Sequence, residues 1–208
     1  DNADIAIDPN VPHIRTKQVK AMSRLDFVRG IKVSASNKVL GNYTRAATSF
    51  KDRGEFAIYI GNAKLIFDIY RPYHGLVGTI REHWDRFRRA GGMPVGVVSG
   101  PANALPREWA FAWQVCRAGD EERMDRAQKL VEAFRECTVT ASGKRTLACL
   151  KRSLYREGVI SNASVAPGTP ELSKEDAEQF DIAFEEVKKL AASEIGDPWL
   201  TRFERRNY

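Results

Sequence analysis

Cysteine and histidine are scarce in this 208-residue sequence, with three residues of each. The cysteines are odd in number and lack C-x-x-C spacing, which favours a reducing compartment and argues against a structural disulfide. The histidines have no metal-ligand spacing. The sequence therefore predicts no metal site.

Long apolar runs and several familiar catalytic motifs are also missing. No run approaches the roughly 18 apolar residues of a membrane span, and no leader follows Asp1, so we expect no signal peptide and a cytoplasmic protein. The sequence contains no G-x-S-x-G, P-loop or G-x-G-x-x-G motif. A serine hydrolase, a kinase and a dinucleotide-dependent dehydrogenase are therefore disfavoured.

Charge is plentiful but mixed. The 33 basic residues are interspersed with 27 acidic ones, for a net charge of +6. A nucleic-acid-binding surface usually concentrates its basic residues on one face. We therefore expect no nucleic-acid partner, and the balance suits solubility or a small anionic substrate.

The first half of the sequence alternates strands with helices. Apolar strands are expected at 27–34, 56–60 and 94–99, after a possible short strand at 4–7 and a helix at 16–25. Helices are expected between the strands, at 36–52, 65–70 and 80–89. This order predicts parallel strands joined by right-handed crossovers.

The second half is predicted to be helical. Helix starts are indicated by Pro106, Asp120 and Ser173, and helix ends by Gly119 and Gly158. Apolar residues recur there at helical spacing, which indicates a packed helical core. No further strand is expected after residue 100.

Lys32 stands out because it lies in an apolar strand. Alternation places Lys32 and Ser34 on one face of that strand. A buried ammonium group is costly, so desolvation favours a neutral amine that can attack a carbonyl carbon. The alternative is an edge-strand lysine whose amine reaches water.

In parallel α/β folds the functional site lies at the carboxyl ends of the strands. Those ends carry Ser34, Gly61 and Ser99, and a tight turn at 100–103 whose amides are candidates to bind a carboxylate. Gly61 leaves room for a substrate beside the backbone.

The order of these motifs resembles the dihydrodipicolinate synthase / N-acetylneuraminate lyase family. The resemblance rests on GIKVS at 30–34, IG at 60–61 and GVVSGPANALP at 96–106, followed by the helical tail. It implies a (β/α)8 TIM barrel, with strands about 5/6 to 8 in residues 1–104. Residues 105–208 then form the last barrel helix and a C-terminal helical extension.

The resemblance also implies a mechanism and a set of site residues. Lys32 matches the family's lysine that forms a Schiff base with pyruvate or another 2-oxo acid, without a metal or organic cofactor. The implied substrate-binding residues are Ser34, Gly61, Val98, Ser99 and Asn103. A homo-oligomer, commonly a tetramer, is the implied assembly.

The departures from the family are specific. The early strands with their threonine motif are missing, and no tyrosine matches the fifth-strand proton relay, whether the strand is 4–7 or lies before Asp1. We expect the chain to correspond to the C-terminal two thirds of an aldolase-type enzyme and to be inactive alone.

Residues 70–92 form a longer link than the family has. If 65–70 is the crossover helix, the extra piece lies at the amino-terminal face of the barrel and serves packing or subunit contact. If 80–89 is the crossover helix, Arg71, Tyr73 and His74 line the mouth of the site.

The favoured activity is that of a lyase acting on a sugar-acid-like 2-oxo acid. Arg15 is offset from the arginine with which the synthases bind their dicarboxylate, which disfavours the alternative, condensation of pyruvate with aspartate semialdehyde. A second alternative is a non-catalytic relative that binds a 2-oxo acid or serves as a scaffold.

Overall fold

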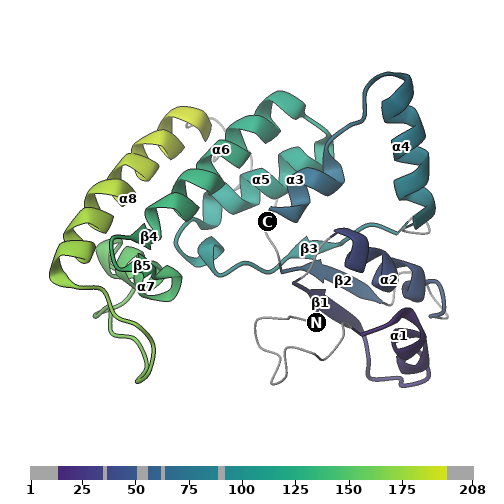
Figure 1. The fold of residues 1–208 in the computed structure, drawn as a ribbon, viewed down its shortest axis with the longest axis horizontal. Coiled ribbons are helices and arrows are strands. Elements are labelled where there is room, and N and C mark those ends of the chain that lie inside the picture. Colours follow the sequence, from purple (N-terminus) through teal and green to yellow (C-terminus); the bar gives the residue numbers. More distant parts are fainter. Residues whose placement is uncertain (1–13, 35–36, 51–55, 62–63, 89–91, 196–208) are drawn as a thin grey trace, which may run out of the picture. The chain divides into compact units, whose positions relative to one another are not determined.

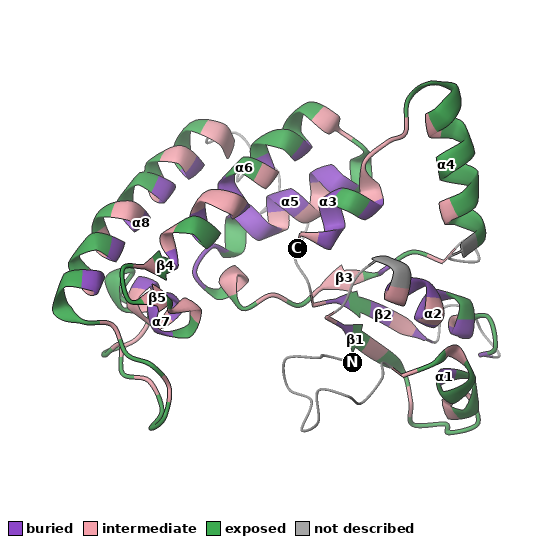
Figure 2. Ribbon diagram, in the orientation of Figure 1, coloured by how far each residue is buried: buried purple, intermediate pink, exposed green. Residues whose placement is uncertain are grey.

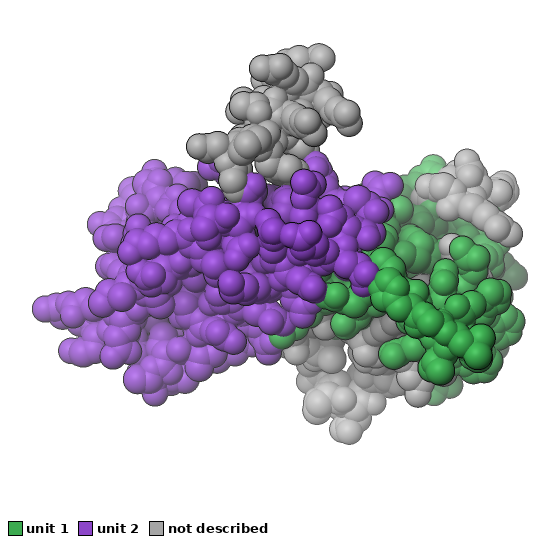
Figure 3. All heavy atoms as spheres, turned by 90° about the horizontal axis from the view of Figure 1, so that it is seen from above, with its two compact units in different colours: residues 1–99 green, residues 100–208 purple. Residues whose placement is uncertain are grey.

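A computed structural model describes residues 14–34, 37–50, 56–61, 64–88 and 92–195. The strand expected at 4–7 lies outside these residues. The chain divides into two compact units, residues 1–99 and 100–208 (Figure 3). The boundary expected after residue 104, between barrel and extension, stays a prediction.

Unit 1 contains a three-stranded parallel sheet (Figure 1). Strand β1 spans Gly30–Val33, β2 Ala57–Ile60 and β3 Gly96–Val97, in the order β1-β2-β3. The parallel pairing predicted from the sequence is confirmed. The first and third strands are shorter than expected, and Phe27 lies in a turn with 81% of its surface exposed.

The two faces of this sheet differ in burial. Val33, Ile58 and Ile60 are buried on one face. On the other face Lys32 is exposed, as is Tyr59, its partner in the register. The expectation that Lys32 lies on a buried inner face is wrong for the described residues, and the second strand, although largely apolar, is also exposed on this face at Tyr59. Three strands with helices on one side leave their second face uncovered.

Four helices belong to unit 1. Helix α1 spans Thr16–Met22, α2 Asn37–Ala47, α3 Leu65–Tyr70 and α4 Gly75–Arg88. Helix α3 has the bounds that the sequence predicts, is largely buried and contacts α2. Helix α4, in contrast, is exposed along most of its length (Figure 2).

Unit 2 is mainly helical, as predicted. A short 3-10 turn η2, Pro101–Asn103, precedes helices α5 Pro106–Ala118, α6 Glu121–Cys137, α7 Thr146–Arg156 and α8 Lys174–Ile195. Asp120 accepts a hydrogen bond from the Arg123 amide at 3.1 Å and thereby caps α6. Gly119 ends α5 with a φ of +68°, a conformation that glycine adopts at little cost.

Aromatic contacts and an ion pair hold these helices together. Phe184 of α8 lies 6.0 Å from the ring of Phe134 on α6 and 5.7 Å from Phe180. Arg152 of α7 donates two hydrogen bonds, of 2.8 and 2.6 Å, to the carboxylate of Asp181 on α8. Such a bidentate pair fixes orientation as well as distance.

The sequence did not indicate a small antiparallel hairpin, β4 Val139–Thr140 and β5 Gly143–Lys144. It packs against the first turn of α8, where Asp176 is buried. Ser173 caps that turn by accepting from the Asp176 amide at 3.0 Å, as predicted. The Ser142 hydroxyl, followed by that of Thr140 and the turn amides, lowers the pKa of the Asp176 carboxyl.

The three cysteines are free thiols. Burial raises the pKa of Cys137 to about 12 and of Cys149 to about 11, so neither thiol is a ready nucleophile at neutral pH.

None of the helices in the described ranges has the length and apolar character to cross a membrane.

Asp176→Asn is expected to lower the melting temperature at neutral pH. The folded-state pKa of Asp176 is depressed, so its stabilisation is complete above its unfolded value of about 3.9 and is lost as pH falls through the folded value. Thermal unfolding of both proteins from pH 7 to pH 2.5 measures the difference, which should shrink below about pH 4. The exposed Asp125→Asn is the control, and a difference that grows in acid would contradict the assignment.

Candidate functional site at the strand ends

Lys32, Ser34 and Gly61 meet at the carboxyl ends of β1 and β2. The Gly61 amide donates a hydrogen bond to the Val33 carbonyl at 2.8 Å, which extends the β1–β2 pairing by one residue. A methyl group at Gly61 would lie 2.7 Å from Lys32 Cε and would overlap Ser34 Oγ. The structure therefore brings together three of the residues that the sequence singled out.

Val98 continues the same face on β3. Its amide donates to the Ile60 carbonyl at 2.8 Å, and 45% of its surface is exposed. Since Gly96 pairs with Tyr59 and Tyr59 with Lys32, alternation places Val98 on the face that carries Lys32.

Ser99 lies two residues after the end of β3 and carries a hydroxyl group. Its Oγ is buried and makes no hydrogen bond in the described part of the chain. A buried hydroxyl without a partner is costly, so this atom is suited to a polar group that binds beside it.

Asn103 belongs to unit 2, where it closes the η2 turn. Its backbone amide and its side-chain amide both donate to the Gly100 carbonyl, at 3.0 and 2.9 Å. The Ala104 amide is likewise engaged with the Pro101 carbonyl at 3.1 Å. The Asn103 amide is therefore engaged within the turn, and the carboxylate-binding role expected for the amides of 100–103 stays a prediction for the remaining ones. A substrate-binding role for Asn103 stays a prediction.

Tyr59 is a residue of this face that the sequence reasoning did not select. A methyl group at Gly96 would lie 2.9 Å from two carbons of the Tyr59 ring, so the ring covers that glycine. The sequence contained a pattern that could have selected Tyr59, because this residue alternates with the buried Ile58 and Ile60 and is two residues from Gly61. An aromatic ring beside Lys32 supplies an apolar wall.

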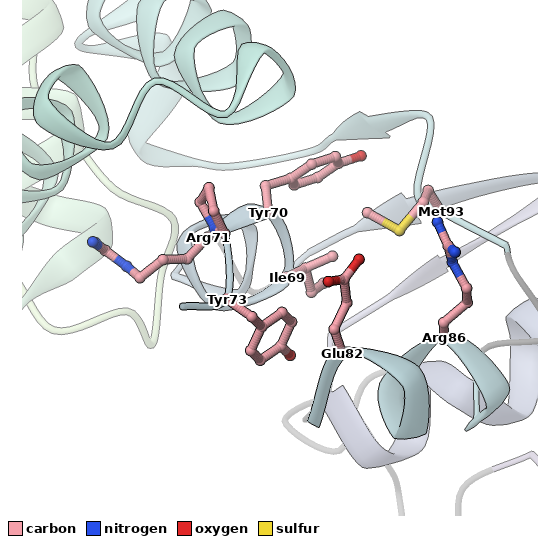
Figure 4. Close-up of a pocket in the computed structure, with 8 residues that line it drawn as sticks. Ile69, Tyr70, Arg71, Tyr73, Glu82, Arg86 and Met93 are labelled. Carbon is pink, nitrogen blue, oxygen red and sulfur yellow. The ribbon is translucent and has the colours of Figure 1, made fainter. Parts of the chain in front are cut away.

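A separate cavity of about 400 Å³ lies between α3 and α4 (Figure 4). Arg71 and Tyr73 line it, together with Met93, which precedes β3. The Tyr70 hydroxyl also donates to the Pro94 carbonyl at 2.8 Å, which ties this region to the amino-terminal end of β3. The cavity is therefore at the end of the strand opposite to Val98. The burial of α3 and the exposure of α4 favour 65–70 as the crossover helix, and the role of residues 70–92 stays a prediction.

Potential metal ligands do not cluster in the described ranges: no group of three or more histidine, cysteine, aspartate or glutamate side chains is placed to hold an ion. The chemical groups at the strand ends are an amine, two hydroxyls and the backbone.

No protein-family model matches the sequence, and no curated protein matches it. Solved structures do match. Dihydrodipicolinate synthase from Bacteroides thetaiotaomicron superposes with a TM-score of 0.64 at 19% identity, over 88% of this chain and 54% of its own. The chain shares the fold of that protein.

Two further structures agree. Dihydrodipicolinate synthase from Oceanobacillus iheyensis has a TM-score of 0.59 at 14% identity and covers 86% of this chain. A dihydrodipicolinate synthase family protein from Coccidioides immitis has a TM-score of 0.57 at 15% identity and covers 89%. The resemblance predicted from the sequence is confirmed at the level of the fold.

This chain spans about half the length of the structures it resembles, 54, 52 and 54% of the three. These neighbours imply a TIM-barrel fold, of which the described residues contain three parallel strands. The roles of Lys32, Ser34, Gly61, Val98 and Ser99 stay predictions.

Gly30→Ala is expected to destabilise the chain by about 1–3 kcal/mol, because its methyl group would overlap the Ala57 carbonyl oxygen and push β1 from β2. Gly61→Ala should change the stability by less than about 1 kcal/mol, since the ends of Lys32 and Ser34 can rotate away. Thermal unfolding followed by circular dichroism compares them. Equal losses would contradict this description of the site.

Proposed function

We propose that the protein is a lyase that acts on 2-oxo acids through a Schiff base on Lys32. The observation that carries the proposal is the meeting of Lys32, Ser34 and Gly61 at the carboxyl ends of parallel strands. The fold likeness to dihydrodipicolinate synthases supports it. Neither feature alone selects this chemistry, and the proposal rests on the two together.

The chemistry follows from the amine. Lys32 Nζ attacks the ketone carbon of the 2-oxo acid, and the carbonyl oxygen leaves as water after taking up two protons. The resulting iminium withdraws electrons from the neighbouring carbon. A carbon–carbon bond to that carbon then breaks or forms, or an adjacent hydroxyl is eliminated.

The other residues would position the substrate. Ser34 lies close enough to Lys32 to donate to a substrate hydroxyl, and Gly61, which lacks a side chain, leaves the space that the Lys32 and Ser34 side chains occupy. The backbone at Val98 and the partnerless Ser99 hydroxyl would contact the rest of the molecule. Asn103 acts, in this proposal, by holding the turn that follows Ser99.

A closed barrel is part of the proposal. Lys32 is exposed on the open face of the three described strands. Nucleophilic lysines work in sites where water is excluded. Five further strands, completing the eight of a (β/α)8 barrel, would cover this face. We therefore expect no catalysis from the 208-residue chain on its own.

For the substrate we favour a sugar-acid-like 2-oxo acid. Arg15 is offset from the position of the arginine with which the synthases bind their dicarboxylate, and it immediately precedes α1. Condensation of pyruvate with aspartate semialdehyde remains the alternative. Comparison of kcat/KM for aldonic 2-oxo acids and for aspartate semialdehyde with pyruvate separates the two.

Reductive trapping tests the central claim. The protein at its full natural length is incubated with pyruvate and cyanoborohydride, and the adduct is located by peptide mass spectrometry. We expect it on Lys32, its loss in Lys32→Arg, and its persistence in Lys20→Arg, which alters an exposed lysine on α1.

If the full-length protein folds and no adduct forms on Lys32, the enzyme proposal fails. The second alternative, a non-catalytic relative, would then be favoured. Binding of a 2-oxo acid without an adduct, measured by calorimetry, would identify that case.

A further inference from the structure

Helix α4 turns its polar face towards its own unit. The Tyr73 hydroxyl donates to the Asp85 carboxylate, and a methyl group at Gly78 would lie 3.2 Å from the Tyr73 backbone. Glu82 and Arg86 line the cavity next to α3 (Figure 4). At 100° per residue, these contacts all lie on one side of the helix.

The opposite side of α4 is apolar and exposed. The exposed fractions are 80% for Leu76, 81% for Val77, 64% for Ile80, 55% for Trp84 and 71% for Phe87. A surface helix normally turns such residues inward. Because α4 is inverted, we infer that its apolar face contacts something outside unit 1.

A complementary surface exists in unit 2. A groove of about 550 Å³ lies between α6 and α8, beside β4. Its floor includes the buried Phe180 and Val187, and Val139 at its edge is 59% exposed. The acidic side chains at its rim are Glu136 from α6 and Glu186 from α8.

The two surfaces match in length. On α8 the groove runs from Gln179 to Leu190, about 16 Å at 1.5 Å per residue. On α4 the apolar residues run from Leu76 to Phe87, about 16 Å by the same rise. The exposed apolar residues of α4 recur every three or four residues, as they do in helices that bind in a groove.

The two surfaces also match in charge. Arg81 and His83 border the apolar face of α4 on its two sides, whereas Glu82 and Asp85 lie on the inward side. Glu136 and Glu186 border the groove, and Glu186 also pairs with Lys189 at 2.7 Å. Arg81 beside the apolar face of α4 is therefore opposite in charge to Glu136 and Glu186 beside the groove.

We propose that α4 of one copy docks into the α6–α8 groove of a second copy. Two α4 helices are poorer partners for each other, because Arg81 of one would face basic residues of the other. A membrane is a poorer partner too, because Glu82 and Asp85 offset Arg81 and Arg86 and reduce attraction to anionic lipid. In a two-fold pair each copy supplies one helix and one groove.

Charge reversal tests the pairing. Sedimentation velocity of the protein at its full natural length over a concentration series should show association. Arg81→Glu, and separately the pair Glu136→Arg with Glu186→Arg, should each raise the dissociation constant about tenfold. All three substitutions together in one chain should return the dissociation constant to that of the unmodified protein. The exposed Arg107→Glu and Glu178→Arg are matched controls outside both surfaces.

The apolar contact has its own test. Ile80→Glu should abolish association, whereas Ile182→Glu, on an exposed position of α8 outside the groove, should not. A chain that is monomeric at every concentration would overturn the proposal. Association that is lost in Ile80→Glu but unaffected by Glu136→Arg with Glu186→Arg would also overturn the proposal. That result would indicate that α4 of one copy pairs with α4 of the other. Binding of the chain to phosphatidylserine vesicles that Ile80→Glu removes would instead assign the face to a membrane.

Discussion

The parallel pairing of β1 with β2 is the constraint on which the candidate site depends. The register sets Gly30 against Ala57 and Lys32 against Tyr59, and it ends with the Gly61 amide on the Val33 carbonyl. Gly30 permits this register because any larger residue would overlap the Ala57 carbonyl oxygen. A slip by one residue would turn Lys32 to the buried face. The pairing thus decides which side chains lie on the open face of the sheet.

The pairing of β1 with β2 puts the polar side chains of the candidate site on the open face of the sheet. Helices bury Val33, Ile58 and Ile60, and the same alternation leaves Lys32 and Tyr59 exposed. In a closed barrel that second face becomes the interior, where polar groups are concentrated at the carboxyl ends of the strands. The buried Ser99 hydroxyl, which makes no hydrogen bond within the described residues, lies after the last of those ends.

Helix α4 and unit 2 show how one sequence pattern serves different purposes. Apolar residues at helical spacing form the core between α6 and α8, where Phe134, Phe180 and Phe184 contact one another. On α4 the same kind of spacing yields an exposed face, because Tyr73 binds the polar side through Asp85. Periodicity indicates that a face is apolar, but the partner of that face depends on the contacts around the helix.

Local chemistry explains which parts could be predicted from the sequence. Caps at Asp120 and Ser173, the glycine after α5 and the bounds of α3 depend on neighbouring residues, and the structure agrees with each. The order of strands and helices likewise determined the parallel sheet. The motif order around Lys32 was enough to indicate the family whose solved structures this chain resembles in fold.

Burial and contacts between distant residues could not be predicted in this way. The exposure of Lys32, the Tyr59 ring over Gly96 and the inward polar face of α4 depend on what packs against each residue. The hairpin at β4 and β5 forms from two strands of two residues each, and groups of its turn lower the pKa of Asp176 on a different element, α8. The sequence by itself determined the elements and their order. Only the tertiary structure decided which faces are covered, because burial is a property of the neighbours and not of the residue.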